Sequence, residues 1–180
     1  MCLTPAAKRY QEEVERRRLA ALEAVDDLPI AVLIWGPSPT APTPLSDTRV
    51  KLRDELIRNG HLAQFSEDLI DPLSHHGLQV QQLSHLESHD IVFSIPGSPG
   101  SIAEIHDFAK LPRLSNKIVT FLDRAYNDGY ANLALMELQT QVTCAIELYD
   151  AIDLPTCVIE KAMTKVRQLQ ELYYLLGRRV

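Results

Sequence analysis

Most of the candidate catalytic and ligand-binding residues lie in one segment, Pro96-Gly97-Ser98-Pro99-Gly100-Ser101-Ile102-Ala103-Glu104. An apolar, β-branched run precedes it and a helical pattern follows it, so we expect a glycine-rich loop between a strand and a helix. The first amides of a helix have no partner inside the helix and can hold an anionic ligand. The segment therefore predicts a ligand-binding loop, formed by Pro96, Gly97, Ser98, Gly100 and Ser101.

Glu104 is the candidate catalytic residue of this segment, because it stands three residues after Ser101. This spacing puts its carboxylate within reach of a ligand that the loop holds. The same spacing is that of a capping box, in which Ser101 and Glu104 satisfy each other's backbone amides. The sequence supports a catalytic acid, a helix cap, or both.

Predicted strands and helices alternate along the chain, and they position this loop. Apolar runs predict the strands, at 30–35, 61–65, 91–95, 118–122 and 142–148. Helical patterns separate them, and strands that alternate with helices imply right-handed crossovers and a parallel sheet. We therefore predict an α/β fold, a doubly wound, mainly parallel sheet of about five strands flanked by helices, with extra N- and C-terminal helices.

Two other strand ends carry small or polar residues, Gly36-Pro37-Ser38 after the first strand and Asp123 after the fourth. In doubly wound sheets a ligand binds outside the carboxyl ends of the strands, at the point where the strand order reverses. We expect these residues to share one crevice with the loop at 96–104. Gly36, Pro37 and Ser38 would bind the ligand, and Asp123 would be a second acid.

A proline-rich loop at 38–47 precedes the helix predicted at 49–59, for which Asp47 or Thr48 is the expected N-cap. A long loop over a strand end can be a functional lid, and an inert surface connection fits equally well. Arg49 could reach a phosphate from the start of this helix. The pattern favours a surface ion pair for it.

The 180 residues fit a single domain. Its expected parts are an N-terminal helix within 1–28, an α/β core at 29–150 and a C-terminal helix at 155–178. Both terminal helices have apolar stripes that a small sheet does not fully cover. The stripes either pack on the core or form the contact of a homo-oligomer.

Composition and missing motifs exclude several classes of function. The formal net charge of −6 argues against nucleic-acid binding. No apolar run approaches the ~20 residues that span a bilayer, and the first residues lack the layout of a secretion signal, so we expect a cytoplasmic protein without a membrane partner. Walker, nucleophile-elbow and metal-ligand patterns are missing, so no cofactor and no metal are predicted.

The loop at 96–104 resembles the Pro-Gly-Gly-x-Gly-Thr-x-x-Glu signature of the nucleotide-binding superfamily that includes Smf/DprA and LOG proteins (SLOG), with Ser98 in place of the second glycine. It is also similar to nucleoside deoxyribosyltransferases, in which a glutamate on a helix after a glycine-containing loop is the nucleophile. Trp35-Gly36-Pro37 resembles the strand-Gly-Pro opening of those transferases. The resemblance covers roughly residues 30–125 and implies a Rossmann-like domain that binds a nucleoside or nucleotide.

The resemblance implies cleavage or transfer at an N-glycosidic bond, with Glu104 beneath the ribose. Such a reaction passes through an oxocarbenium-like state, which a carboxylate beneath the sugar can stabilise or trap. A second acid would help the base to leave, and Asp123 is the best-placed candidate, ahead of Asp68 and Glu67. Two alternatives are a nucleotide-sensing module without catalysis, in bacterial signalling or defence, and an NAD hydrolase like the toll/interleukin-receptor domains.

Overall fold

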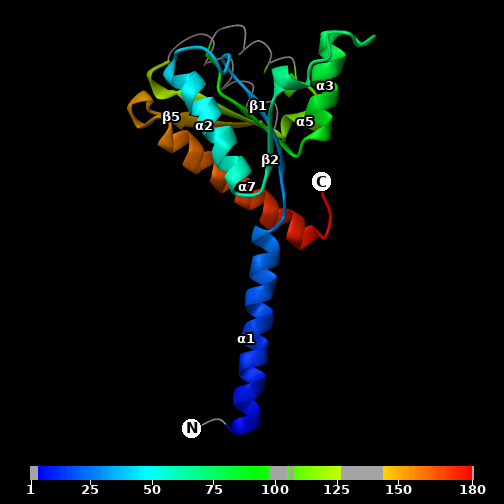
Figure 1. Cartoon of the computed structure of the whole chain (residues 1–180), viewed down its shortest axis with the longest axis vertical. Coiled ribbons are helices and arrows are strands. Elements are labelled where there is room, and N and C mark those ends of the chain that lie inside the picture. Colours follow the sequence, from blue (N-terminus) through cyan, green and yellow to red (C-terminus); the bar gives the residue numbers. More distant parts are fainter. Residues whose placement is uncertain (1–3, 98–104, 106–107, 127–143, 180) are drawn as a thin grey trace.

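A five-stranded parallel sheet forms the centre of the protein (Figure 1). The structure is a computed structural model, which describes residues 4–97, 105, 108–126 and 144–179. The strand order is β2-β1-β3-β4-β5, and every neighbouring pair is parallel. The strands are β1 (Ala31–Trp35), β2 (Leu62–Phe65), β3 (Ile91–Ser94), β4 (Ile118–Asp123) and β5 (Ala145–Tyr149). This confirms the predicted doubly wound α/β fold.

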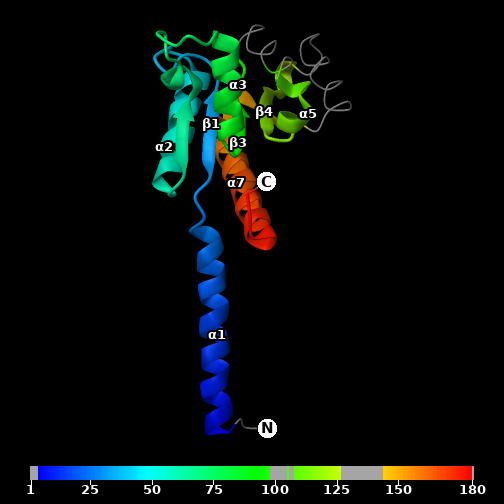
Figure 2. The same cartoon turned by 90° about the vertical axis from the view of Figure 1, so that its right-hand side faces the viewer.

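Helices cover both faces of the sheet. The described helices are α1 (Pro5–Asp26), α2 (Pro44–Arg58), α3 (Leu78–Ser88), α5 (Pro112–Ser115) and α7 (Thr156–Leu176), with short 3₁₀ turns η1 (Ser66–Leu69), η2 (Arg124–Tyr126) and η3 (Ala151–Asp153). α2 and α7 pack on one face, and α3 and α5 pack on the other (Figure 2). The sheet is therefore buried between two layers of helices, as its apolar strands require.

The core has two halves, one on each face of the sheet, because successive side chains of a strand point to opposite faces. On β1, Val32 and Ile34 pack with α2 and α7, whereas Leu33 and Trp35 pack on the side of α3 and α5. All four are buried. The unbroken apolar run of β1 is thus explained by its central place in the sheet.

Helix α2 begins earlier than the sequence pattern predicts. Its N-cap is Thr43, whose Oγ1 accepts a hydrogen bond from Ser46 N at 3.2 Å, and Pro44 occupies the first turn. The prediction of Asp47 or Thr48 as the cap is wrong, because a proline is well suited to the first helical position and Thr43 directly precedes it. The connection after β1 is therefore shorter than the predicted loop at 38–47.

Helix α1 confirms the predicted N-terminal helix and projects from one end of the body, as both views show (Figures 1 and 2). Its C-terminal end is fixed to α7, where Gln170 Nε2 donates hydrogen bonds to the carbonyl oxygens of Asp26 at 2.9 Å and Leu28 at 2.8 Å. None of the described helices has the length and apolar character needed to cross a membrane.

Candidate functional site

The strand order reverses between β1 and β3. From β1 the chain passes through α2 to β2 on one side, and from β2 it passes through α3 to β3 on the other side of β1. The connections therefore diverge at the carboxyl ends of β1 and β3, which is the place where doubly wound proteins bind ligands.

The segments that follow β1 and β3 lie against one another at this point. Trp35 pairs with Ser94 at the ends of the two strands. A Cβ added to Gly97 would lie 3.5 Å from Pro37 Cβ, and a Cβ added to Gly36 would lie 3.0 Å from Ile95 O. The structure thus brings together the predicted residues Gly36 and Pro37 with Pro96 and Gly97.

Asp123 ends β4 and lies at the same edge of the sheet. Ser94 at the end of β3 pairs with Thr120, so Asp123 stands three residues beyond that pair, at the end of β4. Asp123 Oδ1 accepts a hydrogen bond from Ala125 N at 2.9 Å. One carboxylate oxygen therefore shapes the turn into η2, and the side chain stays half-buried at the edge.

The other predicted residues of the loop, Ser98, Gly100, Ser101 and Glu104, lie outside the described residues. Ile105, which follows Glu104, is described and fully buried in the core half that also contains Trp35. The chain directly after Glu104 is thus fixed to the sheet on the face of α3 and α5.

Arg49 is the main residue of this region that the sequence interpretation missed. Its side chain is 0% exposed, so the predicted surface ion pair is wrong. Nη2 donates to Ile34 O at 2.6 Å, and Nη1 donates to Pro37 O at 2.8 Å and to Gly36 O at 3.3 Å. A buried guanidinium needs several acceptors, and the carbonyls at the end of β1 supply them.

Glu67, at the start of η1, is a further partner of Arg49, whose buried Nε has no hydrogen-bond partner among the described residues. Its two carboxylate oxygens each accept a hydrogen bond of 2.6 Å from Arg49, in the bidentate geometry that favours arginine. Burial alone would raise the pKa of Glu67, but the hydrogen bonds from Arg49 outweigh this and lower it. The guanidinium of Arg49 also lies over the Phe65 ring, 4.3 Å from its centroid.

These contacts make Arg49 the support of the loop after β1. A Cβ on Gly36 would lie 3.1 Å from Arg49 Cδ, so a glycine is needed for the arginine to pass. Ser46 Oγ donates to Ser38 O at 2.7 Å and fixes the next part of the loop to α2. A signal for the burial of Arg49 exists in the sequence, since it shares the spacing i, i+3, i+7 with the buried Leu52 and Leu56.

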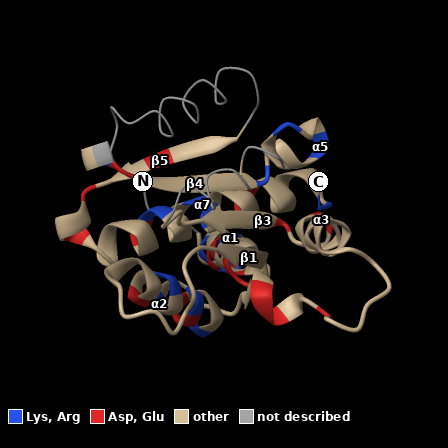
Figure 3. Cartoon of the chain, turned by 90° about the horizontal axis from the view of Figure 1, so that it is seen from above, with Lys and Arg blue, Asp and Glu red and all other residues tan. Residues whose placement is uncertain are grey.

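The outer surface of α2 carries both signs of charge (Figure 3). Lys51 pairs with Asp47 at 2.8 Å, and Arg53 pairs with Asp54 at 2.9 Å. This helix therefore offers no continuous basic surface of the kind that binds a nucleic-acid backbone.

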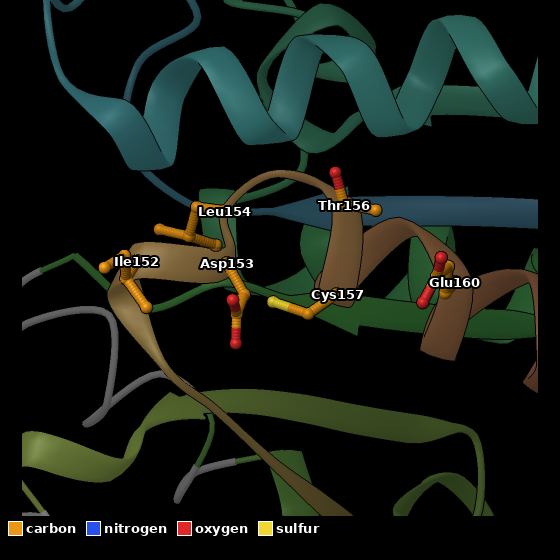
Figure 4. A pocket seen from close by; sticks show the side chains of 6 residues that line it. All are labelled: Ile152, Asp153, Leu154, Thr156, Cys157 and Glu160. Atoms are coloured by element: carbon orange, nitrogen blue, oxygen red, sulfur yellow. The ribbon is translucent and has the colours of Figure 1, made fainter.

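A hollow of about 440 Å³ lies where β5 leads into α7 (Figure 4). Its lining includes Asp153 and Cys157. Burial, together with the charge of Asp153, raises the pKa of the Cys157 thiol. The thiol is therefore protonated at neutral pH and is not an activated nucleophile.

The histidines of α3 do not form a metal site. His89 Nδ1 lies 2.6 Å from His85 O, and His89 Nε2 lies 3.3 Å from Gln64 Oε1. Both ring nitrogens thus face oxygen atoms of the protein. Among the residues that the structure describes, no group of three or more His, Cys, Asp or Glu could hold a metal ion.

The strand order and the meeting of two Gly-Pro segments define this candidate site, and the sequence comparisons add no relative to it. No protein-family model matches the chain, and no curated protein is significantly similar to it.

Proposed function

We propose that this protein binds a nucleoside, a nucleotide or an NAD-like molecule at the carboxyl edge of the sheet and cleaves or transfers at its N-glycosidic bond. The observation that carries the proposal is the contact of the two predicted segments, with the Cβ position of Gly97 3.5 Å from Pro37 Cβ at the point where the strand order reverses. A site at this place suits a ligand with phosphate and ribose groups.

The proposed division of the site follows the two segments. Gly36, Pro37 and Ser38 would face the base, and the loop that begins at Pro96 and Gly97 would hold the ribose or its phosphate. Arg49 donates hydrogen bonds to the carbonyl oxygens of Gly36 and Pro37, so the segment after β1 has a fixed shape before a ligand binds. A preformed segment lowers the entropic cost of binding.

The proposed reaction breaks the bond between C1′ of the ribose and a nitrogen of the base. The bonding electrons leave with the base, which takes a proton from an acid, for which Asp123 is the candidate. Glu104 would stabilise the positive charge that develops on the sugar, or bond to C1′. Water, or a second base, would then take the place of the leaving group.

Turnover of several nucleotide classes tests this proposal. The full chain would be incubated with nucleoside monophosphates, deoxynucleosides and NAD, and free base would be measured by chromatography. We expect base release by the wild type and its loss in Glu104→Gln. The matched control is Glu12→Gln on α1, which removes a carboxylate far from the site and should leave turnover unchanged. Equal activity of the wild type and Glu104→Gln on every substrate would contradict the catalytic role.

The same experiment separates the proposal from a nucleotide-sensing module. A ligand that raises the midpoint of thermal unfolding without any release of base would support sensing and overturn catalysis. A Gly97→Trp variant, which adds a large side chain where Gly97 meets Pro37, should abolish that shift if the ligand binds against the two segments.

We also propose that the chain forms a homo-oligomer through its terminal helices. Both helices keep large apolar side chains in contact with water, among them Tyr10 on α1 and Leu172, Leu175 and Leu176 on α7. Apolar residues in such number on two adjacent helices are typical of a contact between subunits.

A further inference from the structure

Helix α1 has no role in the described core. All of Pro5–Asp26 is described, and none of these 22 residues is buried. Tyr10 is 67% exposed, Val14 48% and Leu22 51%. A single helix in water is stabilised chiefly when its apolar face packs on something, so the surroundings of α1 in one copy of the chain do not explain its sequence.

One stripe along α1 follows the spacing of a coiled coil. Steps of three and four residues connect Ala7, Tyr10, Val14, Arg17, Ala21 and Ala24 of α1 with Leu28 just beyond its end, and all of these except Arg17 are apolar. This alternation keeps one stripe in line along the helix, and such a stripe packs on a second helix of the same kind. We propose that α1 pairs antiparallel with α1 of a second copy of this chain, an inference that rests on the proposed homo-oligomer and identifies the helix that carries it.

Charge complementarity favours the antiparallel direction. Along α1 the charged residues form four blocks of alternating sign: basic at 8–9, acidic at 12–15, basic at 16–18 and acidic at 23–27. When the second helix is reversed, each basic block lies opposite an acidic block. A parallel pair in register would place blocks of like charge side by side, which is unfavourable.

The apolar stripe has the same symmetry as the charges. If residue i lies opposite residue 31 − i of the second helix, Tyr10 faces Ala21 of the partner subunit and Val14 faces Arg17 of the partner subunit. Large residues then lie opposite small ones, and the long stem of Arg17 covers the valine. One register therefore satisfies both the stripe and the charge blocks.

The body of the protein permits this pairing. Gln170 anchors the carbonyls of Asp26 and Leu28, and α1 projects away from the rest of the chain (Figures 1 and 2). Tyr10 and Val14 of the stripe are exposed. Reversal of the second helix puts the two α/β bodies at opposite ends of the pair, where they do not compete for space. α1 leaves from the end of the body opposite the carboxyl edge of the sheet, so the pairing of α1 does not involve that edge (Figure 1).

A matched pair of variants tests the surface. Val14 and Leu19 are both 48% exposed, but they stand five residues apart, roughly 140° around the helix. By sedimentation equilibrium of the full chain, Val14→Lys, which places a cation opposite Arg17 of the partner subunit, should weaken dimerisation by roughly a hundredfold, and Leu19→Lys should leave it unchanged. A third variant, Leu172→Glu with Leu176→Glu, tests α7. Circular dichroism would verify that each variant is folded.

The outcomes separate this inference from the proposal on which it rests. Loss of the dimer in the α7 variant alone would retain the homo-oligomer and overturn pairing through α1. A monomer at every concentration would overturn both. Equal weakening of the dimer by Val14→Lys and Leu19→Lys would contradict the assignment of the apolar stripe as the contact.

Disulfide cross-linking tests the direction, in a Cys2→Ser background that retains Cys144 and Cys157. In an antiparallel pair, Tyr10→Cys mixed with Ala21→Cys should give a cross-linked dimer, whereas either variant alone should give no more than the background. Residues 10 and 21 are roughly 16 Å apart along one helix, too far for a disulfide between like positions. Efficient cross-linking of Tyr10→Cys with itself would overturn the antiparallel direction.

Discussion

Arginine and glutamate pair in two regions of this protein, on α1 and at the carboxyl edge of the sheet, in opposite surroundings. On α1, Arg16 Nη2 lies 2.8 Å from Glu13 Oε2, and the arginine side chain is 74% exposed. At the sheet edge, Arg49 Nη2 lies 2.6 Å from Glu67 Oε2, and the arginine side chain is fully buried. The distances are similar, but water competes for the first pair and is excluded from the second arginine.

Burial and further hydrogen-bond partners, rather than the ion pair itself, decide how much an arginine contributes to the stability of the fold. Arg16 bonds only to Glu13 among the described residues, whereas Arg49 also holds the carbonyls of Ile34, Gly36 and Pro37. An exposed pair is screened by solvent and costs side-chain entropy. A buried arginine that loses its place leaves backbone carbonyls unsatisfied. The two regions should therefore respond very differently to the same substitution.

The largest effect is expected from Arg49→Met, which keeps much of the apolar stem and removes the guanidinium. The carbonyls of Ile34 and Pro37 lose their donor inside the protein, so the free energy of unfolding should fall by about 3 kcal/mol. Urea unfolding followed by circular dichroism measures this change. A loss no larger than that of an exposed arginine would show that burial does not distinguish the two regions.

Gly36→Ala should have the next largest effect, because it disturbs the same arginine from the other side. The new Cβ would lie 3.0 Å from Ile95 O and 3.1 Å from Arg49 Cδ, so the loop or the arginine must move. We expect a loss of about 2 kcal/mol in the free energy of unfolding. Gly77→Ala is the matched control, since no atom lies within 4 Å of its Cβ position and little change is expected. Equal effects of the two substitutions would contradict the close packing at Gly36.

Glu67→Gln should have a smaller effect that depends on pH. The pKa of Glu67 is lower in the folded protein than its ordinary value of 4.5, so its ionised form adds stability above that pH. This stability is lost as the pH falls through the folded-state pKa. Glu67 is 43% exposed, so solvent screening limits the contribution to less than about 1 kcal/mol. Unfolding measured from neutral to acidic pH should show the wild type and Glu67→Gln converging at low pH. A constant difference would contradict a role for the charge.

The sequence predicts which backbone segments form this site better than it predicts the side chain, Arg49, that holds one of them in place. The runs that become β1 and β3 are apolar apart from Ser94 and are followed by Gly36-Pro37 and Pro96-Gly97, so their burial and their common edge follow from strand chemistry. The place of Arg49 does not follow in the same way. Its acceptors are backbone carbonyls of another element, and a backbone carbonyl has no signature in the sequence.

The start of α2 shows the same limit on a local scale. Thr43, Asp47 and Thr48 can all cap a helix, and the choice depends on whether Pro44 lies inside the first turn. Residue type alone leaves that choice open. The hydrogen bond from Ser46 N to Thr43 Oγ1 identifies the cap in the folded chain.

The smallest effect is expected from Arg16→Met, the counterpart of Arg49→Met on α1. Arg16 is exposed, and Glu13 keeps its second partner, Arg17, at 2.8 Å. Arg16 also lies off the apolar stripe, and Arg17 and Arg18 retain the charge of its basic block, so the substitution leaves the proposed helix pair intact. We expect no measurable change in the urea midpoint of the full chain at equal protein concentration. A loss of unfolding free energy close to that of Arg49→Met would mean that α1 is a structural part of the α/β body. It would also contradict the distinction between an exposed and a buried arginine.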